Sequence, residues 1–251
     1  MNIIRFRRQH SGQLVRISVH RRWSEDSIML THPSKPRARF EDPLWLFFRA
    51  RTKLYTLWLS AIYPFASRGR NLSIHYAIKL SRRIANQIKL GNSVIIWEDV
   101  WLHIEPDCGN ELKIIVDDNC SIGARTSISA KNCIHLEENV IMATSVLLQD
   151  HNHAYEDTSL PIRDQGVTAG GRIRIEQGCW IGQGAAIVCN EGELVIGRNS
   201  VVGANSLVTR SFPPHSVIVG NPARVARRFD PAKGTWVGGE TGRTMPTEPA
   251  R

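Results

Sequence analysis

The sequence predicts a mainly β protein folded as a parallel β-helix, and a six-residue spacing of apolar side chains carries this prediction. An α-helix returns a side chain to the same face every 3.6 residues and a β-strand every two, so neither explains a spacing of six. Six-residue repeats are a signature of the parallel β-helix. The series comprises Val116, Ile122, Ile128, Ile134, Val140 and Val146, then Ile175, Ile181 and Ile187, and then Ile196, Val202 and Val208.

The repeat also predicts how the coils stack. Three six-residue sides complete one triangular coil, so residues 18 apart are expected to stack, as with Val116 under Ile134. The stacked aliphatic side chains would fill the interior, because no coil can bury its apolar residue alone. Cys120 and similar small residues, four places after the apolar positions, suit the corners. Gly123 and Gly182 directly follow apolar positions, where glycine permits the backbone angles of a tight corner.

Three gaps interrupt the series, and each predicts an insertion between coils. A weaker series begins at Leu90, and the gaps lie at 103–115, 147–174 and 188–195. Insertions in repeat proteins form loops on one face, which is often the binding face. The longest gap contains the sequence Asp-His-Asn-His at 150–153, so we expect the chemistry to lie there.

Charge and apolar patterns divide the chain into four segments. The 251 residues carry a net charge of +9, and residues 1–90 hold 18 Lys and Arg against 4 Asp and Glu. This asymmetry fits either a basic arm that meets an anionic surface or a solvated face. We expect a basic tail at 1–40, a helical leader at 41–89, the β-helix domain at 90–228 and a flexible C-terminal tail at 229–251.

Residues 43–63 are the most apolar stretch of the chain and predict a helix within the leader. Arg49, Arg51 and Lys53 interrupt the stretch, so it falls short of the ~20 apolar residues that span a bilayer. A polar stripe that includes Lys53 and Thr56 faces a broad apolar side. The pattern fits either a helix lying on anionic lipid or a helix packed against the β-helix.

Cysteine usage and the N-terminus point to a cytoplasmic protein. The five cysteines form no C-x-x-C pair, so we expect reduced thiols and no metal site. The first thirty residues are rich in Arg and lack a long apolar run, so no signal peptide is expected. The predicted location is cytoplasmic, with peripheral contact at the inner face of the membrane through the basic N-terminal region. No nucleic-acid-reading module is apparent, so no nucleic acid partner is expected.

Four features in a fixed order give the chain a family resemblance over residues 90–228. They are the hexapeptide series, the histidine loop, the segment Cys-Trp-Ile-Gly at 179–182 and the segment GNPAR at 220–224. Together they resemble the hexapeptide-repeat acyltransferases, in particular the maltose/galactoside acetyltransferase-like branch, which includes sugar and polysaccharide O-acetyltransferases. The resemblance implies a left-handed coil, a homotrimer with active sites between protomers, and acetyl-CoA as the acyl donor.

The resemblance also assigns roles to individual residues. His151 matches the family's general base, and His153 is the alternative. An imidazole, with an ordinary pKa of ~6.5, can take the proton of an acceptor hydroxyl at neutral pH. Asp150 and Trp180 are assigned to the acceptor side, and Asp150 could instead orient the imidazole. The expected acyl-donor contacts are Gly182 and Ala185 at the oxyanion, Gly203, Ala204, Thr209 and Arg210 along the pantetheine, and Arg224 and Arg227 at the phosphates.

The expected function is an acetyl-CoA-dependent O-acetyltransferase that acts on a sugar hydroxyl in surface polysaccharide or glycolipid synthesis. Three alternatives stay open. They are a serine acetyltransferase-like enzyme, a zinc lyase of the γ-carbonic anhydrase type using His103, His135 and His151, and an inactive trimeric scaffold. The stretch 189–193 is longer than the family's usual step, and its two Glu residues would not attract phosphates. The acceptor sugar, its position, O- versus N-transfer and the acyl group are not specified by the sequence.

Overall fold

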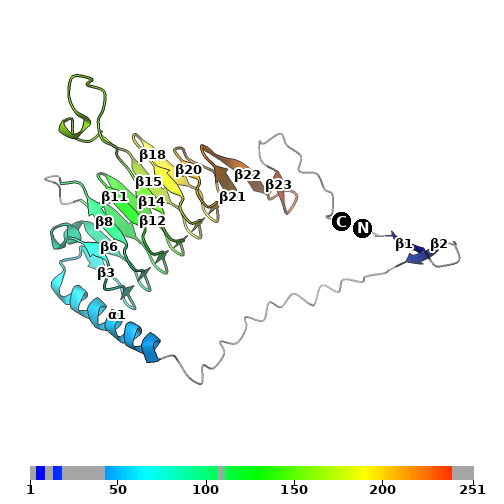
Figure 1. The fold of residues 1–251 in the computed structure, drawn as a ribbon, viewed down its shortest axis with the longest axis horizontal. Coiled ribbons are helices and arrows are strands. Elements are labelled where there is room, and N and C mark those ends of the chain that lie inside the picture. Colours follow the sequence, from blue (N-terminus) through cyan, green and yellow to red (C-terminus); the bar gives the residue numbers. More distant parts are fainter. Residues whose placement is uncertain (1–3, 9–13, 19–42, 107–108, 110, 239–251) are drawn as a thin grey trace. The chain divides into compact units, whose positions relative to one another are not determined.

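The computed structural model describes residues 4–8, 14–18, 43–106, 109 and 111–238. They belong to two separate units, Met1–Asp42 and Pro43–Arg251. In the first unit, β1 (Ile4–Arg8) and β2 (Leu14–Ser18) pair as an antiparallel hairpin, within the segment expected as a basic tail. The second unit holds one helix, α1 (Pro43–Ile62), and a long stack of short strands (Figure 1).

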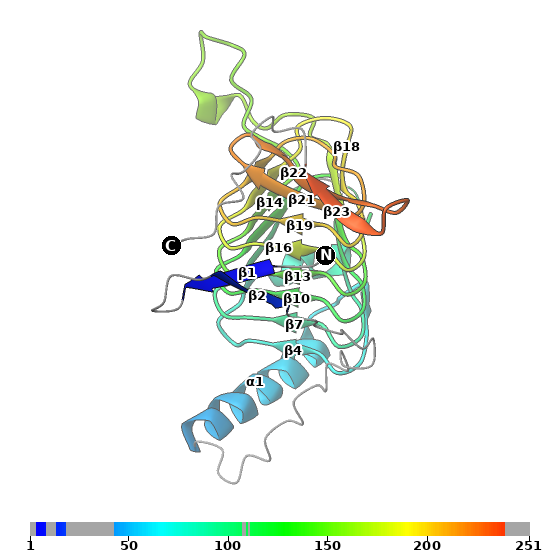
Figure 2. The same ribbon diagram turned by 90° about the vertical axis from the view of Figure 1, so that its right-hand side faces the viewer.

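The second unit is a three-sided parallel β-solenoid of about six coils, which confirms the predicted fold class (Figure 2). Its sides are three sheets, here called sheets I, II and III. Sheet I contains β3 (Ser67–Arg68), β6 (Ile88–Leu90), β9 (Ile114–Val116), β12 (Cys133–Leu136), β15 (Arg172–Ile175) and β18 (Glu193–Ile196). Sheet II contains β4 (Ser73–Ile74), β7 (Ile95–Ile96), β10 (Ser121–Ile122), β13 (Ile141–Met142), β16 (Trp180–Ile181), β19 (Val201–Val202) and β21 (Ser216–Gly220). Sheet III contains β5 (Lys79–Leu80), β8 (Trp101–Ile104), β11 (Ser127–Ala130), β14 (Leu147–Gln149), β17 (Ala186–Val188) and β20 (Leu207–Val208).

The stacking register differs from the expected 18 residues. Val116 lies beside Leu136 and not beside Ile134, a separation of 20 residues. Each side of a coil points two side chains inward, two residues apart; where the strand is only two residues long, the first of them is the corner residue before it, as with Val140 before Met142. The corner at 131–132 adds two residues to its coil. After this corner, the members of the six-residue series occupy the other of the two inward positions. Every residue of the predicted series is therefore buried, although the predicted stacking pairs are wrong.

The insertions emerge at one corner of the prism. The corners from sheet I to II and from II to III hold four residues in every full coil, as at 117–120 and 123–126. The corner from sheet III to sheet I, here called the variable corner, has no fixed length. The connections at this corner include 81–87, 105–113, 150–171 and 189–192. The first of them contains the 3-10 helix η2 (Arg82–Gln87). The expectation that insertions share one face agrees with this arrangement.

Two kinds of residue make the tight corners possible. Asn119 and Gly178 take the left-handed backbone conformation, with φ of 59° and 71°. Gly123 is needed for a different reason from the one expected: a Cβ atom there would lie 2.3 Å from the carbonyl oxygen of Ala143 in the next coil. Successive coils therefore approach most closely where the sequence places glycine after an apolar position.

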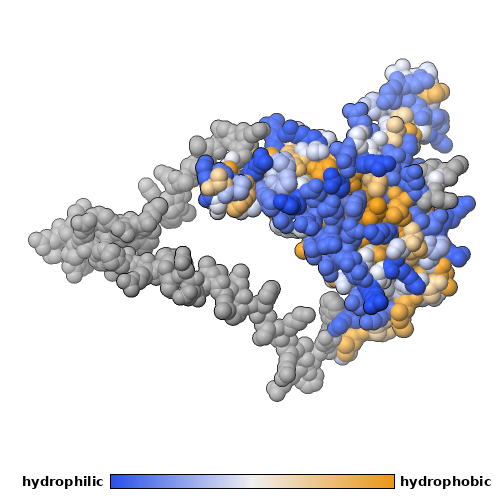
Figure 3. Space-filling view, turned by 180° about the vertical axis from the view of Figure 1, so that it is seen from behind, coloured by the Kyte–Doolittle hydropathy of each residue, from blue (hydrophilic) through white to orange (hydrophobic). Residues whose placement is uncertain are grey.

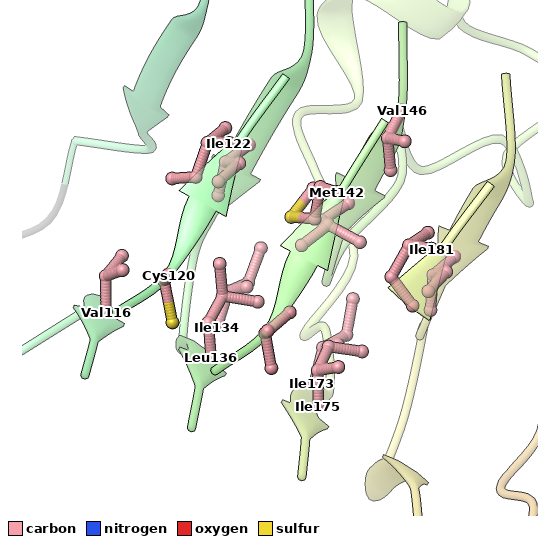
Figure 4. Packing of buried hydrophobic residues seen from close by; sticks show 14 of the residues in the cluster. Val116, Cys120, Ile122, Ile134, Leu136, Met142, Val146, Ile173, Ile175 and Ile181 are labelled. Atoms are coloured by element: carbon pink, nitrogen blue, oxygen red, sulfur yellow. The ribbon is translucent and has the colours of Figure 1, made fainter. Parts of the chain in front are cut away.

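The core is a column of aliphatic side chains inside the prism (Figure 4). Ile122, Met142 and Ile181 stack in consecutive coils of sheet II. Fully burying one such side chain contributes about 1.5–3 kcal/mol. Because the contribution is repeated in each coil, the ladder supplies the main stabilisation of the fold.

Helix α1 covers the open end of the first coil. It begins at Pro43, whose fixed φ suits the first helical position, and ends just before Tyr63 and Pro64. Leu59 is fully buried against the core, and the Thr56 hydroxyl accepts a 2.9 Å hydrogen bond from the amide of Ile74 in β4. The first coil, β3–β5, lies within residues 41–89, so only part of the expected leader is helical.

The last carbonyls of α1 are capped by side chains from the solenoid. Arg68 donates to the carbonyl of Ser60, and Arg82 donates to the carbonyl of Ile62 at 3.1 Å. These contacts satisfy carbonyls that the helix leaves without internal partners, and the cations complement its C-terminal dipole.

The C-terminal end of the solenoid continues as an antiparallel extension. After β21, the strands β22 (Ala223–Asp230) and β23 (Thr235–Gly238) pair in turn. Residues 229–238, expected to belong to a flexible tail, thus extend sheet II, while 239–251 lie outside the described residues. Among the residues that the structure describes, no helix combines the length and hydrophobicity that crossing a bilayer requires.

Candidate active site

His151 and His153 lie at the base of the same loop but face different surroundings. The loop 150–171, here called the arm, leaves the variable corner directly after β14. His151 is 4% exposed, whereas His153 is exposed and forms an antiparallel bridge with Val167. Burial and fixed contacts therefore favour His151, of the two, as a positioned functional group.

The carboxylate of Asp150 holds His151 in place. Its Oδ1 accepts the amide of Lys131 at 2.7 Å, and its Oδ2 accepts the amides of Asn132 and Cys133 at 2.8 and 2.9 Å. The Nδ1 atom of His151 lies 3.0 Å from the same Oδ1. Asp150 is fully buried, so it orients the imidazole and does not line a surface that an acceptor could touch.

A second carboxylate, from two coils earlier, lies on the other side of the ring. The Nε2 atom of His151 is 3.5 Å from Oε1 of Glu105, and Nε2 of His103 is 3.1 Å from the same oxygen. His103 in turn stacks on Trp101 with ring centroids 5.0 Å apart. Sequence reasoning missed Glu105 and Trp101, and it considered His103 only as a zinc ligand. These residues share a position on β8 or just after it, two coils before His151. That shared position is the signal by which they could have been found.

This arrangement defines the proton positions on His151. An ionised carboxylate can only accept hydrogen bonds, so the Nδ1 atom facing Asp150 carries the proton. In the neutral ring, Nε2 then holds the lone pair and can take a proton from a bound molecule. Glu105 and Asp150 would balance the positive charge that forms on the ring. The geometry is that of a general base oriented by a carboxylate.

The arm is tied together at its base and exposes apolar residues at its tip. The amide of Gly171 donates to the carbonyl of Asp150 at 2.7 Å, and Asn152 and Thr168 exchange two hydrogen bonds. The tip projects beyond the solenoid (Figure 1) and includes the 3-10 helix η3 (Ile162–Asp164). Its exposed apolar side chains are Tyr155, Leu160 and Ile162.

The residues expected to contact the acyl donor fall into separate groups. Gly182, Ala185, Gly203 and Ala204 stack in consecutive coils at the corner between sheets II and III. The amide of Gly182 donates to the carbonyl of Val202 at 2.7 Å, and that of Ala185 donates to Gly182 at 3.2 Å. Both amides are therefore engaged within the solenoid, which argues against either one as an oxyanion donor.

The basic residues of this set lie near the C-terminal end of the solenoid. Thr209 and Arg210 are exposed just after β20, and the Arg210 guanidinium lies 5.2 Å from the Phe212 ring centroid. Arg224 and Arg227 are exposed on β22, where they pair with Val219 and Val217 of β21. Exposed guanidinium groups at these positions are free to contact phosphate oxygens.

Trp180 lies on a different side of the prism from His151. It is 52% exposed on sheet II, between Ile141 and Val201 of the neighbouring coils. His151 lies at the variable corner, which is where sheets III and I meet. Within one chain the two side chains are therefore not brought together.

The outer faces of the sheets differ in character. Sheet II exposes the large apolar side chains of Ile95, Ile141 and Trp180, and Trp97 is exposed at the corner just after β7. Sheet I instead carries polar contacts, as in the hydrogen bond between His135 and Asp117 at 2.7 Å and the ion pair between Lys89 and Asp117 at 3.1 Å. Partial burial raises the pKa of Asp117, but these hydrogen bonds outweigh it and hold the pKa below its ordinary value.

The zinc-lyase alternative needs three converging histidines. His135 pairs with Asp117 on sheet I, apart from the His103 and His151 pair that shares Glu105. Within the described ranges, no group of three or more potential metal ligands occurs.

Comparisons with known proteins agree with the fold. The family model of the hexapeptide repeat of succinyl-transferase matches residues 113–148, 172–210 and 193–226. The crystal structure of AntD, an N-acyltransferase from Bacillus cereus in complex with dTDP and 3-hydroxybutyryl-CoA, is similar with a TM-score of 0.56 and 21% identity. That similarity covers 68% of this chain and 86% of the AntD chain.

Sequence relatives carry acetyltransferase names. A Mycobacterium tuberculosis protein named "Probable acetyltransferase Rv3034c" is 27% identical over 162 residues, which are 63% of this chain and 48% of that protein. An Escherichia coli protein named "Putative lipopolysaccharide biosynthesis O-acetyl transferase WbbJ" is 26% identical over 129 residues, 49% of this chain and 64% of that protein. The alignment thus spans about half the length of the mycobacterial relative. Over its solenoid, this chain is therefore similar to hexapeptide-repeat proteins that are named as acetyltransferases.

Proposed function

We propose that this chain is an acetyl-CoA-dependent O-acetyltransferase that modifies a sugar hydroxyl, with His151 as the general base. The observation that carries the proposal is the buried His151 side chain, whose Nδ1 lies 3.0 Å from Oδ1 of Asp150, a contact that leaves Nε2 to accept a proton. A sugar hydroxyl is a poor nucleophile while protonated, so a positioned base is the group that this reaction needs. The similarity to the E. coli relative, whose name refers to lipopolysaccharide O-acetylation, supports a surface glycan or glycolipid as the acceptor.

The proposed transfer is balanced by one proton that His151 first takes and then returns. Nε2 takes the proton of the acceptor hydroxyl as its oxygen forms a bond to the thioester carbonyl carbon. The carbon–sulfur bond then breaks, and His151 gives the proton to the departing sulfur. The products are an acetate ester and the free thiol of coenzyme A. Asp150 and Glu105 stabilise the imidazolium that exists between the two proton transfers.

A homotrimer with its active sites at the seams between protomers is part of the proposal. The exposed apolar side chains of sheet II and of the arm tip would gain stability from burial against a second copy. Such a seam could bring Trp180 of one protomer to His151 of another, which a single chain does not do. Arg224 and Arg227 would contact the phosphates of acetyl-CoA through charge-assisted hydrogen bonds.

The test is turnover by the His151→Ala variant compared with the His153→Ala variant. Release of coenzyme A from acetyl-CoA is followed with nucleotide sugars, amino sugars, lipid-linked oligosaccharides and L-serine as acceptors. We expect kcat to fall about 10²–10⁴-fold in His151→Ala, with acetyl-CoA binding by calorimetry unchanged. Loss of turnover in His153→Ala alone would move the base to His153. Turnover with L-serine only would establish the serine acetyltransferase alternative, and no acetyl-CoA binding by the wild type would favour a scaffold.

A further inference from the structure

Helix α1 is amphipathic in an unusual sense, because the side that faces away from the solenoid is apolar. Thr56 and Leu59 are buried against the first coil. Phe47, Leu54 and Trp58 follow one another at spacings of seven and four residues, which puts them on the side of the helix opposite Thr56. These three side chains are 60%, 69% and 52% exposed.

The exposed apolar surface is concentrated on this helix. Eight of the 19 large hydrophobic side chains that the structure exposes belong to the 20 residues of α1. They are Leu44, Leu46, Phe47, Phe48, Leu54, Leu57, Trp58 and Ile62. The helix lies at the end of the solenoid, and its apolar colouring forms the lower edge of the surface in Figure 3. An exposed patch of this kind marks a site of interaction.

The chain segment that carries the patch is basic, although Lys79 and Lys89 pair with Asp99 and Asp117 of later coils. Residues 43–97 contain nine Lys and Arg and no Asp or Glu. Arg49 and Lys53, one helical turn apart, are exposed along one flank of α1, while the Arg51 guanidinium lies 3.6 Å from the Tyr76 ring centroid. Arg82 and Arg83 are exposed on η2 in the adjacent coil. Helix α1 itself contains no Asp or Glu, so a symmetric pair of α1 helices would place basic side chains close together.

We propose that the outer face of α1 docks on an anionic lipid bilayer. The face, defined by Phe47, Leu54, Leu57 and Trp58, would enter the boundary between headgroups and acyl chains. Arg49 and Lys53 would lie at the level of the anionic headgroups, as flanking cations do on interfacial helices. The helix would lie in the plane of the membrane and hold the solenoid at its surface. This inference does not depend on acyl transfer.

The test is sedimentation of the full chain with vesicles of phosphatidylcholine and phosphatidylglycerol. Wild-type protein is expected to sediment with these vesicles and not with vesicles of phosphatidylcholine alone. Trp58→Glu should weaken the apparent affinity for these vesicles about tenfold or more. It replaces an aromatic side chain that would be buried in the membrane by a negative charge that anionic lipid repels. Trp58→Phe should bind like the wild type. Trp236→Glu is the matched control, since Trp236 is an exposed tryptophan of β23 at the other end of the solenoid.

Two further measurements keep the outcomes separate. Quenching of tryptophan fluorescence by brominated lipid should be smaller in Trp58→Phe than in the wild type, and His151→Ala should sediment like the wild type. Unchanged sedimentation of Trp58→Glu, or equal sedimentation of the wild type with pure phosphatidylcholine, would overturn the proposal. So would a loss of oligomeric mass in Trp58→Glu without vesicles, because the face would then belong to a second copy.

Discussion

Asp150 is the residue on which the geometry of the site depends. Its two oxygens accept three backbone amides from the corner of the coil below, and one of them also faces Nδ1 of His151. All four partners approach as donors, which only an ionised carboxylate can satisfy at once. The side chain therefore joins the stability of the coil to the orientation of the ring.

This arrangement makes Asp150→Asn a test of both roles. An asparagine would replace one of the two oxygens by an NH2 group, so the two partners of that oxygen lose their acceptor. We expect the free energy of unfolding to fall by about 1–3 kcal/mol. We expect kcat to fall about 10²-fold or more, because the imidazole is no longer held in its reactive tautomer. Urea denaturation and thioester cleavage measure the two effects.

Asp157→Asn is the control for that measurement. Asp157 is on the exposed part of the arm, where its carboxylate accepts hydrogen bonds from Ser159. Neither stability nor turnover should change beyond about 0.5 kcal/mol of free energy. Equal effects of the two substitutions would show that the burial of Asp150 has no special consequence.

At the scale of single elements, the coils are limited by how closely their backbones approach. Gly123 lies where a Cβ atom would meet the Ala143 carbonyl oxygen at 2.3 Å, and that oxygen belongs to the backbone of the corresponding corner of the next coil. Neither atom can move without displacing a coil. Gly123→Ala should therefore lower the free energy of unfolding by about 1–3 kcal/mol or more in thermal or urea denaturation.

Gly238 provides the matched comparison on a terminal strand. Among the described residues, no atom lies within 4 Å of a Cβ atom added there. Gly238→Ala should change stability by no more than about 0.5 kcal/mol. If Gly123→Ala were equally mild, the close approach of the coils would not limit the fold.

The element scale also explains what the sequence could and could not predict. Every residue that the spacing of six selected is buried, because each side of a coil offers two equivalent inward positions. The spacing left out the other inward residues, such as Leu136, Met142 and Ile173. The same equivalence hid the 20-residue register, since the series continues unbroken past the two extra residues at 131–132. The first coil escaped notice because η2 lengthens the step from Leu80 to Leu102 to 22 residues.

The candidate site, like the fold, could be predicted from the sequence only in part. His151 was predicted because a histidine at the start of the longest insertion has a family counterpart. Glu105 was not, because its contact with His151 depends on the lengths of two intervening coils, and these vary at the corner where both residues lie. The Asp150 contact was underestimated, since neighbouring residues in a regular strand point apart. Here the strand has already ended at Gln149.

At the scale of the whole molecule, the buried cysteines report whether the coils unfold together. Cys120 and Cys179 lie in different coils, and burial raises the pKa of each thiol to about 11. Near pH 8 only about one such thiol in a thousand is ionised, so both should resist alkylation in the folded protein.

Pulsed alkylation across a urea gradient, with each cysteine identified by mass spectrometry, measures this directly. In a solenoid each coil contacts only its neighbours, so the two thiols label together only if the ladder unfolds as one unit. We expect coincident labelling of Cys120 and Cys179. The half-buried Cys133 should react at lower urea. Labelling of either buried thiol in native buffer would contradict the burial seen here.

The variable corner has a consequence for how such proteins diversify. Two corners of every coil have a fixed length, and the third alone accommodates insertions, including the arm between Asp150 and Gly171. Evolution can therefore lengthen, shorten or graft a loop at that edge while leaving the hydrophobic ladder intact. Under the proposed function, acceptor preference could change at this edge without a penalty in folding, and an exchanged arm should carry its selectivity along with its sequence.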